Sequence, residues 1–314
     1  MLLLVWFFII EVLILLFLKY VLEGRSLYLP HEIKRDRKRV AEFEEKIRIF
    51  NNETPMDPRF KNFSNEELDC PIYRIFPLKY FLDMIENSRL LLPKINSWED
   101  PYENFILRSN IFANGELIEN LQEESDLVFG QCWSIATEND AMWRIYSPNK
   151  ECIRVKTSVR KLLNLLCPVI QKEGHFGLFL NETIIGKVLY KDQTDINVWV
   201  DSIEINPHNS DIMPIIIESL LIKRKAFEHE KEVRVIFNAE DSDERFLDGT
   251  PNLVVFEMDR PMDFIEEVKF DPRCDNSFFS LYKKIFVEKY HFEAASIIKS
   301  NMYEFEPFDI NLNV

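Results

Sequence analysis

Residues 227–237, FEHEKEVRVIF, alternate between two kinds of side chain, as expected of a β-strand. One set becomes apolar from Val233 onward and suits a core: Phe227, His229, Lys231, Val233, Val235 and Phe237. The other set is Glu228, Glu230, Glu232, Arg234 and Ile236. Same-face neighbours on a strand lie roughly 7 Å apart, so three such carboxylates repel one another unless a cation, a proton or a substrate lies between them. The stretch therefore predicts either a functional site or an edge strand with a solvated charged face.

Composition limits the class of protein. A chain of 314 residues with 46% hydrophobic residues can hold one large domain or two small ones. A net charge of −15 argues against a nucleic-acid scaffold held by a broad basic surface. Seven glycines and no GxxxxGK[ST] or GxGxxG pattern argue against a glycine-rich phosphate loop.

The cysteine and histidine patterns do not predict a metal site. No two of the five cysteines have CxxC spacing, and their scatter is typical of reduced thiols in a cytosolic protein; they are Cys70, Cys132, Cys152, Cys167 and Cys274. His229 and Glu230 begin like the HExxH pattern, but Val233 stands where its second histidine is required.

The first 22 residues predict a transmembrane anchor. Residues 2–22 are apolar except for Glu11 and Lys19, and they are long enough to span a bilayer. Basic residues follow, so the rest of the chain is expected in the cytoplasm, on a single-pass protein of the inner (cytoplasmic) membrane. The alternative is a buried amphipathic helix in a soluble protein, which Glu11 favours because a carboxyl group is costly inside a bilayer.

The remainder divides into a juxtamembrane segment, 23–68, and a globular domain, 69–314. A charged helix is expected over 30–50 and a linker over 51–69. In the domain we expect strands at 71–76, 90–92, 129–135, 152–156, 186–190, 227–237, 253–258, 265–270 and 295–300. Helices are expected at 78–88, 118–126, 141–146, 158–167, 212–223 and 277–290. Because no regular βαβ repeat appears, the fold class is α+β, with mixed or antiparallel sheets flanked by helices.

Four segments in this order resemble a bacterial family known as domain of unknown function 2971. They are YRIFPLKYFLDMIENSRLLLPKINSWEDPYE, FGQCWSIATENDAMWRIYSPNKECIRV, KRKAFEHEKEVRVIF and IEEVKFDP, and the resemblance covers about residues 72–299. Glu99 stands where the family loop usually has asparagine. The family's name implies no reaction, and a role in phage defence or as a toxin-like effector is an analogy with anchored proteins of this kind.

A second resemblance is to ADP-ribosyltransferases, including toxin-type members. Their signature is an arginine or histidine on the first strand, a serine or tyrosine on a middle strand, and an ExE strand. Arg74, Ser134 and Glu230-x-Glu232 follow that order. The resemblance implies NAD as the substrate and an ADP-ribosyltransferase-like fold. It leaves open whether ADP-ribose goes to water, as in an NAD glycohydrolase, or to a protein or nucleic-acid acceptor.

Each candidate residue has a chemical role in that reaction. Cleavage of the nicotinamide–ribose bond develops positive charge on the ribose, which the Glu232 carboxylate would stabilise while Glu230 activates the nucleophile. Arg74 would bind the diphosphate and Ser134 the ribose. The substrate-binding candidates are Trp143 and Tyr146, for stacking on nicotinamide, with Asp100, Glu103, Lys225 and Arg234.

Two other functions remain open. Glu267-Val268-Lys269, with Asp259 or Asp263 before it and Asp100 or Glu103 as further ligands, imitates the acidic-x-Lys pattern of metal-dependent nucleases. Alternatively, the charges form a closed structural network around Arg74, Arg144, Lys225 and Arg234 in a non-enzymatic sensor or interaction module. Such a network should be satisfied and should contain no cavity.

Overall fold

The structure is a computed structural model, and it describes residues 57–98, 100–113, 116–118, 124–166, 183–203, 212–239, 252–258 and 260–310. The predicted anchor and most of the juxtamembrane segment lie outside these residues, as do Glu99, Cys167 and Asp259. In the described part of the chain, no helix is both long enough and apolar enough to cross a membrane.

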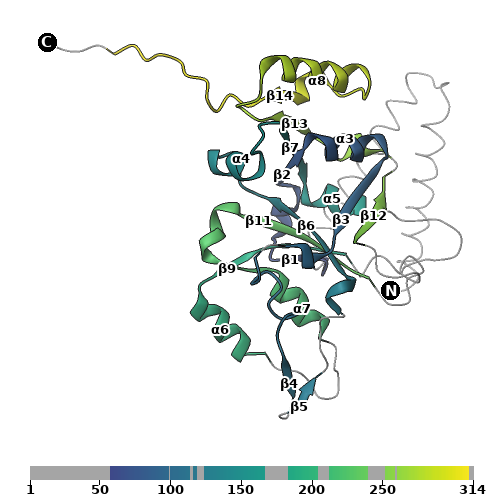
Figure 1. Ribbon diagram of the computed structural model, residues 1–314, viewed down its shortest axis with the longest axis vertical. Coiled ribbons are helices and arrows are strands. Elements are labelled where there is room, and N and C mark those ends of the chain that lie inside the picture. The colour runs from purple at the N-terminus through teal and green to yellow at the C-terminus, as the bar shows by residue number, and fades with distance from the viewer. Residues whose placement is uncertain are drawn as a thin grey trace, which may run out of the picture. The chain divides into compact units, whose positions relative to one another are not determined.

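A mixed sheet of eight strands forms the centre of the fold, in the order β1-β8-β11-β6-β2-β7-β13-β14 (Figure 1). These strands are β1 (Phe60–Lys61), β2 (Pro71–Pro77), β6 (Val128–Ser134), β7 (Cys152–Ser158), β8 (Thr183–Lys187), β11 (Glu232–Asn238), β13 (Glu267–Phe270) and β14 (Ile297–Lys299). The two outermost pairs are parallel and the inner pairs antiparallel. The α+β class predicted from the sequence is therefore confirmed.

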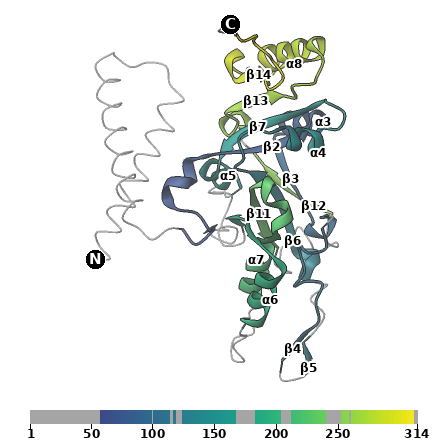
Figure 2. The ribbon, with the colours of Figure 1, turned by 90° about the vertical axis from the view of Figure 1, so that its left-hand side faces the viewer.

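Three short ribbons of two strands accompany the sheet. They pair β3 (Arg89–Pro93) with β12 (Leu253–Glu257), β4 (Ile111–Ala113) with β5 (Glu116–Ile118), and β9 (Leu189–Lys191) with β10 (Ile222–Arg224). The α-helices are α3 (Leu78–Glu86), α4 (Asp140–Tyr146), α5 (Val159–Leu166), α6 (Gln193–Asp201), α7 (Met213–Leu220) and α8 (Asn276–Glu288). Helix α8 lies beside β13 and β14 at one end, and α6 and α7 lie toward the other end (Figures 1 and 2).

Short 3-10 helices complete the described elements. They are η1 (Asn65–Asp69), η2 (Ile95–Ser97), η3 (Glu124–Leu127), η4 (Lys225–Glu230), η6 (Pro261–Asp263) and η7 (Ala294–Ser296).

Strand β11 lies between β6 and β8, so both of its edges are paired, and its residues from Glu232 to Phe237 are buried. On one face, Val233, Val235 and Phe237 are buried, and the Phe237 ring contacts those of Phe129 and Phe256. On the other face, Ile236 joins an apolar cluster that includes Leu220 of α7. The interpretation of this stretch as an edge strand with a solvated face is therefore wrong.

The charged half of that face is buried as well. Gly186 of β8 lies opposite Arg234 in the register, and a Cβ atom added to it would lie 2.5 Å from a methyl group of Leu221. Glycine at this position lets the chain that follows α7 approach the sheet beside the guanidinium. Arg234 itself is 0% exposed.

Several sequence-based boundaries need correction. The strand predicted over 227–237 begins only at Glu232, because residues 225–230 form η4 and Lys231 adopts a left-handed conformation with φ 45°. The helix predicted over 118–126 is contradicted at both described ends, by β5 and by η3. Helix α6 was not predicted, and the predicted helix 212–223 ends at Leu220, where β10 follows.

The linker predicted over 51–69 also needs correction at its end. Phe60 and Lys61 pair with Ile185 and Gly186 and so extend the central sheet. The compact unit that contains the sheet runs from Asp57 to Val314.

Candidate functional site

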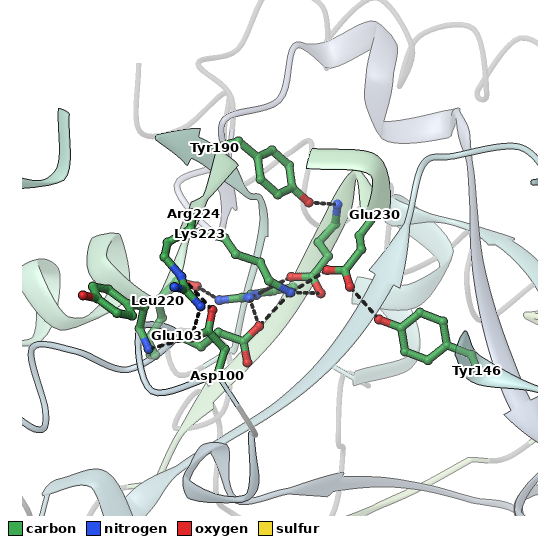
Figure 3. A network of polar contacts seen from close by, with 11 residues as sticks. Asp100, Glu103, Tyr146, Tyr190, Leu220, Lys223, Arg224 and Glu230 are labelled. Carbon is green, nitrogen blue, oxygen red and sulfur yellow. Dashed lines mark hydrogen bonds and ion pairs between the residues drawn. The ribbon is translucent and has the colours of Figure 1, made fainter. Parts of the chain in front are cut away.

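The side chain at the centre of the site is Lys223, from β10, which is 5% exposed. Its ammonium group contacts three carboxylates, with Nζ–O distances of 2.8 Å to Glu103, 2.5 Å to Glu230 and 3.1 Å to Glu232 (Figure 3). Arg234 closes the cluster, with Nη2 lying 2.7 Å from Glu232 and 2.8 Å from Glu103. The cation that the neighbouring Glu230 and Glu232 carboxylates require is thus supplied by the chain itself, whereas Glu228 is exposed.

Electrostatics keep Lys223 and Glu232 ionised. Burial alone would lower the pKa of Lys223, but the carboxylates of Glu232, Glu103 and Glu230 raise that pKa above its usual value. Burial would likewise raise the pKa of Glu232, but Arg234 and Lys223 together hold it below its usual value. Buried charges of this kind are tolerated because each one has a partner of opposite sign. Three carboxylates against two cations leave the cluster with one excess negative charge.

The loop between η2 and β4 supplies carboxylates to these two cations and to the neighbouring Arg224. Asp100 binds Arg224 at 2.9 Å, and Glu103 binds both central cations. The indole of Trp98 lies 4.6 Å from the Arg234 guanidinium, an arrangement that favours a cation–π contact. The acidic loop and the Glu-x-Glu stretch, far apart in sequence, therefore form one network.

A cavity of about 140 Å³ lies beside this network. Residues of three neighbouring strands line it: Tyr73, Arg74 and Ile75 of β2; Cys132, Trp133 and Ser134 of β6; and Glu232 of β11. Glu230 and two residues of α4, Met142 and Tyr146, complete the lining. The structure thus brings all four predicted catalytic residues, Arg74, Ser134, Glu230 and Glu232, to one cavity.

Arg74 lies where the sheet is only weakly joined. Strands β2 and β6 share a single register pair, Tyr73 with Ser134. Beyond this pair, Arg74 donates from Nη1 to the carbonyl oxygen of Cys132 at 2.5 Å. The Nε atom of Arg74 is buried and has no hydrogen-bond partner among the described residues. No carboxylate among those residues forms an ion pair with Arg74. Burial lowers the pKa of Arg74. Glu230 and Glu232 pair with Lys223 and Arg234 and not with Arg74.

Ser134 and Tyr146 both hold the segment that carries Glu230. Ser134 donates from Oγ to the carbonyl oxygen of Glu230 at 2.5 Å and accepts from the Ala136 amide at 2.9 Å. The Tyr146 hydroxyl donates to Glu230 Oε1 at 2.9 Å. Burial and the Glu230 carboxylate raise the pKa of Tyr146, so its hydroxyl keeps its proton. On the opposite side of the network, the Tyr190 hydroxyl accepts from the Glu232 amide at 2.8 Å.

One protein-family model matches the middle of the chain. Residues 142–235 match the family model for DUF2971, described as a protein of unknown function. The match runs from α4 to β11 and confirms the family resemblance seen in the sequence. No curated protein and no solved structure matches the chain.

The DUF2971 match contains Tyr146, Lys223, Glu230, Glu232 and Arg234 but not the loop with Asp100 and Glu103.

The predicted substrate-binding residues take different places. Tyr146 lines the 140 Å³ cavity, whereas Asp100, Glu103 and Arg234 belong to the ionic network. Trp143 is buried, and its Nε1 donates to Glu138 at 2.8 Å. It lines a smaller neighbouring cavity.

Two cations predicted for a buried network are instead on the surface. Lys225 is exposed in η4, and Arg144 is exposed and pairs with Asp140 of its own helix. The sequence alone does not single out Lys223. Residues 221–227, LIKRKAF, contain three consecutive cations, and only the pairing of β10 with β9 decides which one points inward.

Of the residues predicted for a metal site, Asp100 and Glu103 instead bind cations of the chain, whereas Glu267, Lys269 and Asp263 are paired away from the Lys223 cluster. Glu267 and Glu138 both contact Lys269, and Asp263 pairs with Arg260. Within the described ranges, no group of three or more His, Cys, Asp or Glu residues could hold a metal ion. Where three carboxylates do converge, the Lys223 ammonium lies between them.

Proposed function

We propose that this protein is an enzyme that cleaves the nicotinamide–ribose bond of NAD and passes ADP-ribose to water or to an acceptor. The observation that carries the proposal is the cavity shared by Arg74, Ser134, Glu230 and Glu232. Arg74, Ser134 and Glu232 lie on β2, β6 and β11, which are neighbours in the sheet, and Glu230 ends η4 just before β11.

The charges around the cavity suit this reaction. The Glu232 carboxylate, with its lowered pKa, stays ionised and can stabilise the positive charge that develops on the ribose when the C–N bond breaks. Arg74, which has no carboxylate partner among the described residues, supplies positive charge for a phosphate group. Nicotinamide leaves with the bonding electron pair, and water or the acceptor forms the new bond to the ribose carbon and loses a proton.

Glu230 is the group that accepts the proton from the nucleophile. Its carboxylate lines the cavity and accepts from Tyr146, whose side chain reaches it from α4. A nucleophile that displaces the Tyr146 hydroxyl would meet the same carboxylate oxygen.

The test is nicotinamide release from NAD by the full-length chain. Glu232→Gln should lower the rate at least about 100-fold, the usual effect of removing one group that stabilises transition-state charge. Glu228→Gln is the matched control, because Glu228 is exposed two residues before Glu230. No release by the wild type, or equal rates in the two variants, would exclude the proposal.

A second variant, Arg74→Gln, separates a loss of activity from a loss of folding. Glu232→Gln removes a partner of both Lys223 and Arg234, so its folding must be checked by circular dichroism. Arg74→Gln breaks no ion pair within the described residues and should mainly raise the KM for NAD. An unchanged KM there would show that the phosphate does not lie against Arg74.

A non-enzymatic sensor is the second candidate, and one observation favours it. Every charge of the Lys223 cluster has a partner, and the Ser134 hydroxyl is already used as both donor and acceptor. Against the sensor stands the cavity beside the cluster, because a closed structural network would contain none. NAD binding by the wild type without any nicotinamide release would favour the sensor over the enzyme.

We also propose that residues 2–22 anchor the protein in the bacterial inner membrane with the sheet domain in the cytoplasm. This rests on the apolar run and the basic residues after it. The full chain should stay in the membrane fraction after alkaline carbonate extraction, and a chain without residues 1–22 should not. A defence role predicts fewer phage plaques on cells that express the wild type than on cells with Glu232→Gln.

A further inference from the structure

The Glu230 carboxylate has a contact on each of its two oxygens. Oε2 lies 2.5 Å from the Lys223 ammonium group, inside the buried network. Oε1 accepts from the Tyr146 hydroxyl at 2.9 Å (Figure 3). Tyr146 and Glu230 both line the 140 Å³ cavity, so Oε1 is the oxygen on the cavity side. The proposed reaction needs this oxygen for the proton of the nucleophile, and in the structure the Tyr146 hydroxyl covers it.

Tyr146 lies between the cavity and the solvent. Its side chain lines the cavity, yet the residue is 39% exposed, so its ring forms part of the cavity rim. Burial and the Glu230 carboxylate raise the pKa of Tyr146, so its hydroxyl remains a donor to Oε1. A phenol that keeps its proton is not the base of the reaction, and here it occupies the base.

Residues outside α4 fix the chain around Tyr146. Arg273 donates from Nη2 to the carbonyl oxygens of Trp143 at 2.7 Å and Ser147 at 2.8 Å. The Cys152 thiol donates to the carbonyl oxygen of Tyr146 itself at 3.3 Å. The hydroxyl therefore leaves Oε1 only when its own side chain turns, and the exposed side of the ring gives it room to do so.

A hydroxyl held in this way competes with water at a high effective concentration, because the helix that carries it is already in position. A hydrogen bond to a charged group corresponds to about a tenfold to hundredfold change in an equilibrium. A free water molecule offers Oε1 the same kind of bond but no second contact with the protein. An acceptor that binds against the cavity rim is held in place as Tyr146 is, so it can displace the hydroxyl.

We propose that Tyr146 keeps water from Glu230, so that ADP-ribose passes to a bound acceptor with a hydroxyl or amine nucleophile and not to water. The O–H or N–H group of the acceptor gives its proton to Glu230 Oε1. Its lone pair forms the bond to the ribose carbon, and nicotinamide leaves with the electrons of the C–N bond. The inference rests on the proposed function, and it makes Tyr146 the residue that determines specificity for the acceptor.

The test is hydrolysis of saturating NAD by the full-length chain without any acceptor, followed as release of nicotinamide and free ADP-ribose. Tyr146→Phe keeps the ring and removes only the hydroxyl, so it should raise the rate of hydrolysis about tenfold to hundredfold. Tyr80→Phe is the matched control, because Tyr80 is 56% exposed on α3, and it should leave the rate unchanged.

The direction of the change separates the possible roles of this hydroxyl. A lower rate in Tyr146→Phe would show that the hydroxyl relays the proton to Glu230. An unchanged rate would show that water already reaches the carboxylate. Either result overturns the inference.

A second measurement does not depend on turnover. Carboxyl groups are labelled with a water-soluble carbodiimide and glycinamide, and the labelled residues are identified by mass spectrometry. Glu230 should be labelled faster in Tyr146→Phe than in the wild type, whereas the exposed Glu228 should be labelled equally in both. Equal labelling of Glu230 in the two proteins would overturn the inference whatever the activity.

Failure of this inference and failure of the proposed function give different results. Faster labelling of Glu230 in Tyr146→Phe without nicotinamide release from NAD supports the cover on Glu230 and rejects the enzyme. Nicotinamide release without faster hydrolysis in Tyr146→Phe supports the enzyme and rejects the role of Tyr146.

Discussion

Replacing Lys223 by methionine tests whether one ammonium group holds the site together. Methionine has nearly the same length, so the change removes charge while leaving little empty volume. The three carboxylates around Nζ would then be balanced by Arg234 alone. Removing one partner of a buried ion pair typically costs about 3–5 kcal/mol.

Proton uptake sets an upper limit on this loss. A glutamate with a usual pKa of about 4.3 binds a proton at pH 7 at a cost of about 3.7 kcal/mol, since each pH unit corresponds to about 1.36 kcal/mol. The variant can always restore its charge balance in this way. The loss of unfolding free energy should therefore be about 3–3.7 kcal/mol at pH 7 and should shrink by about 1.4 kcal/mol for each unit the pH is lowered toward 5.

Urea-induced unfolding of the full chain, followed by tryptophan fluorescence, measures this difference. Trp98 lies against Arg234 and reports on the network directly. Lys225→Met is the matched control, because Lys225 is exposed two residues along the chain and should change stability by less than about 0.5 kcal/mol. A loss under about 1 kcal/mol at pH 7, or one that stays constant between pH 7 and pH 5, would refute the argument.

Three further predictions concern packing, helix position and pH. Gly186→Ala should lower the unfolding free energy by about 1–3 kcal/mol in thermal unfolding, because the added methyl group meets Leu221; an unchanged midpoint would contradict this packing. Arg273→Gln should speed amide hydrogen exchange at the C-terminal end of α4, where two carbonyl oxygens accept from Arg273; equal exchange rates would show that other contacts hold the helix. The lowered pKa of Glu232 should stabilise the fold above pH 4.5, the usual pKa of glutamate, and this stabilisation should be lost as the pH falls through the folded-state pKa. The raised pKa of Lys223 should stabilise the fold fully below pH 10.5, the usual pKa of lysine, and this stabilisation should be lost at higher pH. Urea unfolding across the pH range should therefore show a plateau between these limits, and a steep change inside it would contradict the ionised cluster.

The sequence by itself determined the fold class and most of the elements. The alternation of VRVIF predicted a strand, and SRLLLP and CIRVK did the same for β3 and β7. Local patterns succeed here because burial repeats every second residue along a strand. The order of Arg74, Ser134 and Glu232 predicted a shared site, and the cavity that they line agrees with that prediction.

Only the tertiary structure decided which charges are buried. No local pattern distinguishes Lys223 from Lys225. Nor does one show that Arg234 takes two carboxylates while Arg74 has none among the described residues. Those choices depend on contacts between segments more than 100 residues apart, such as Glu103 with Arg234. The turn at Lys231 is a further example, because it ends the predicted strand early yet leaves Glu230 and Glu232 on one ammonium group. Coulombic energy depends on distance in space, and the sequence specifies that distance only through the completed fold.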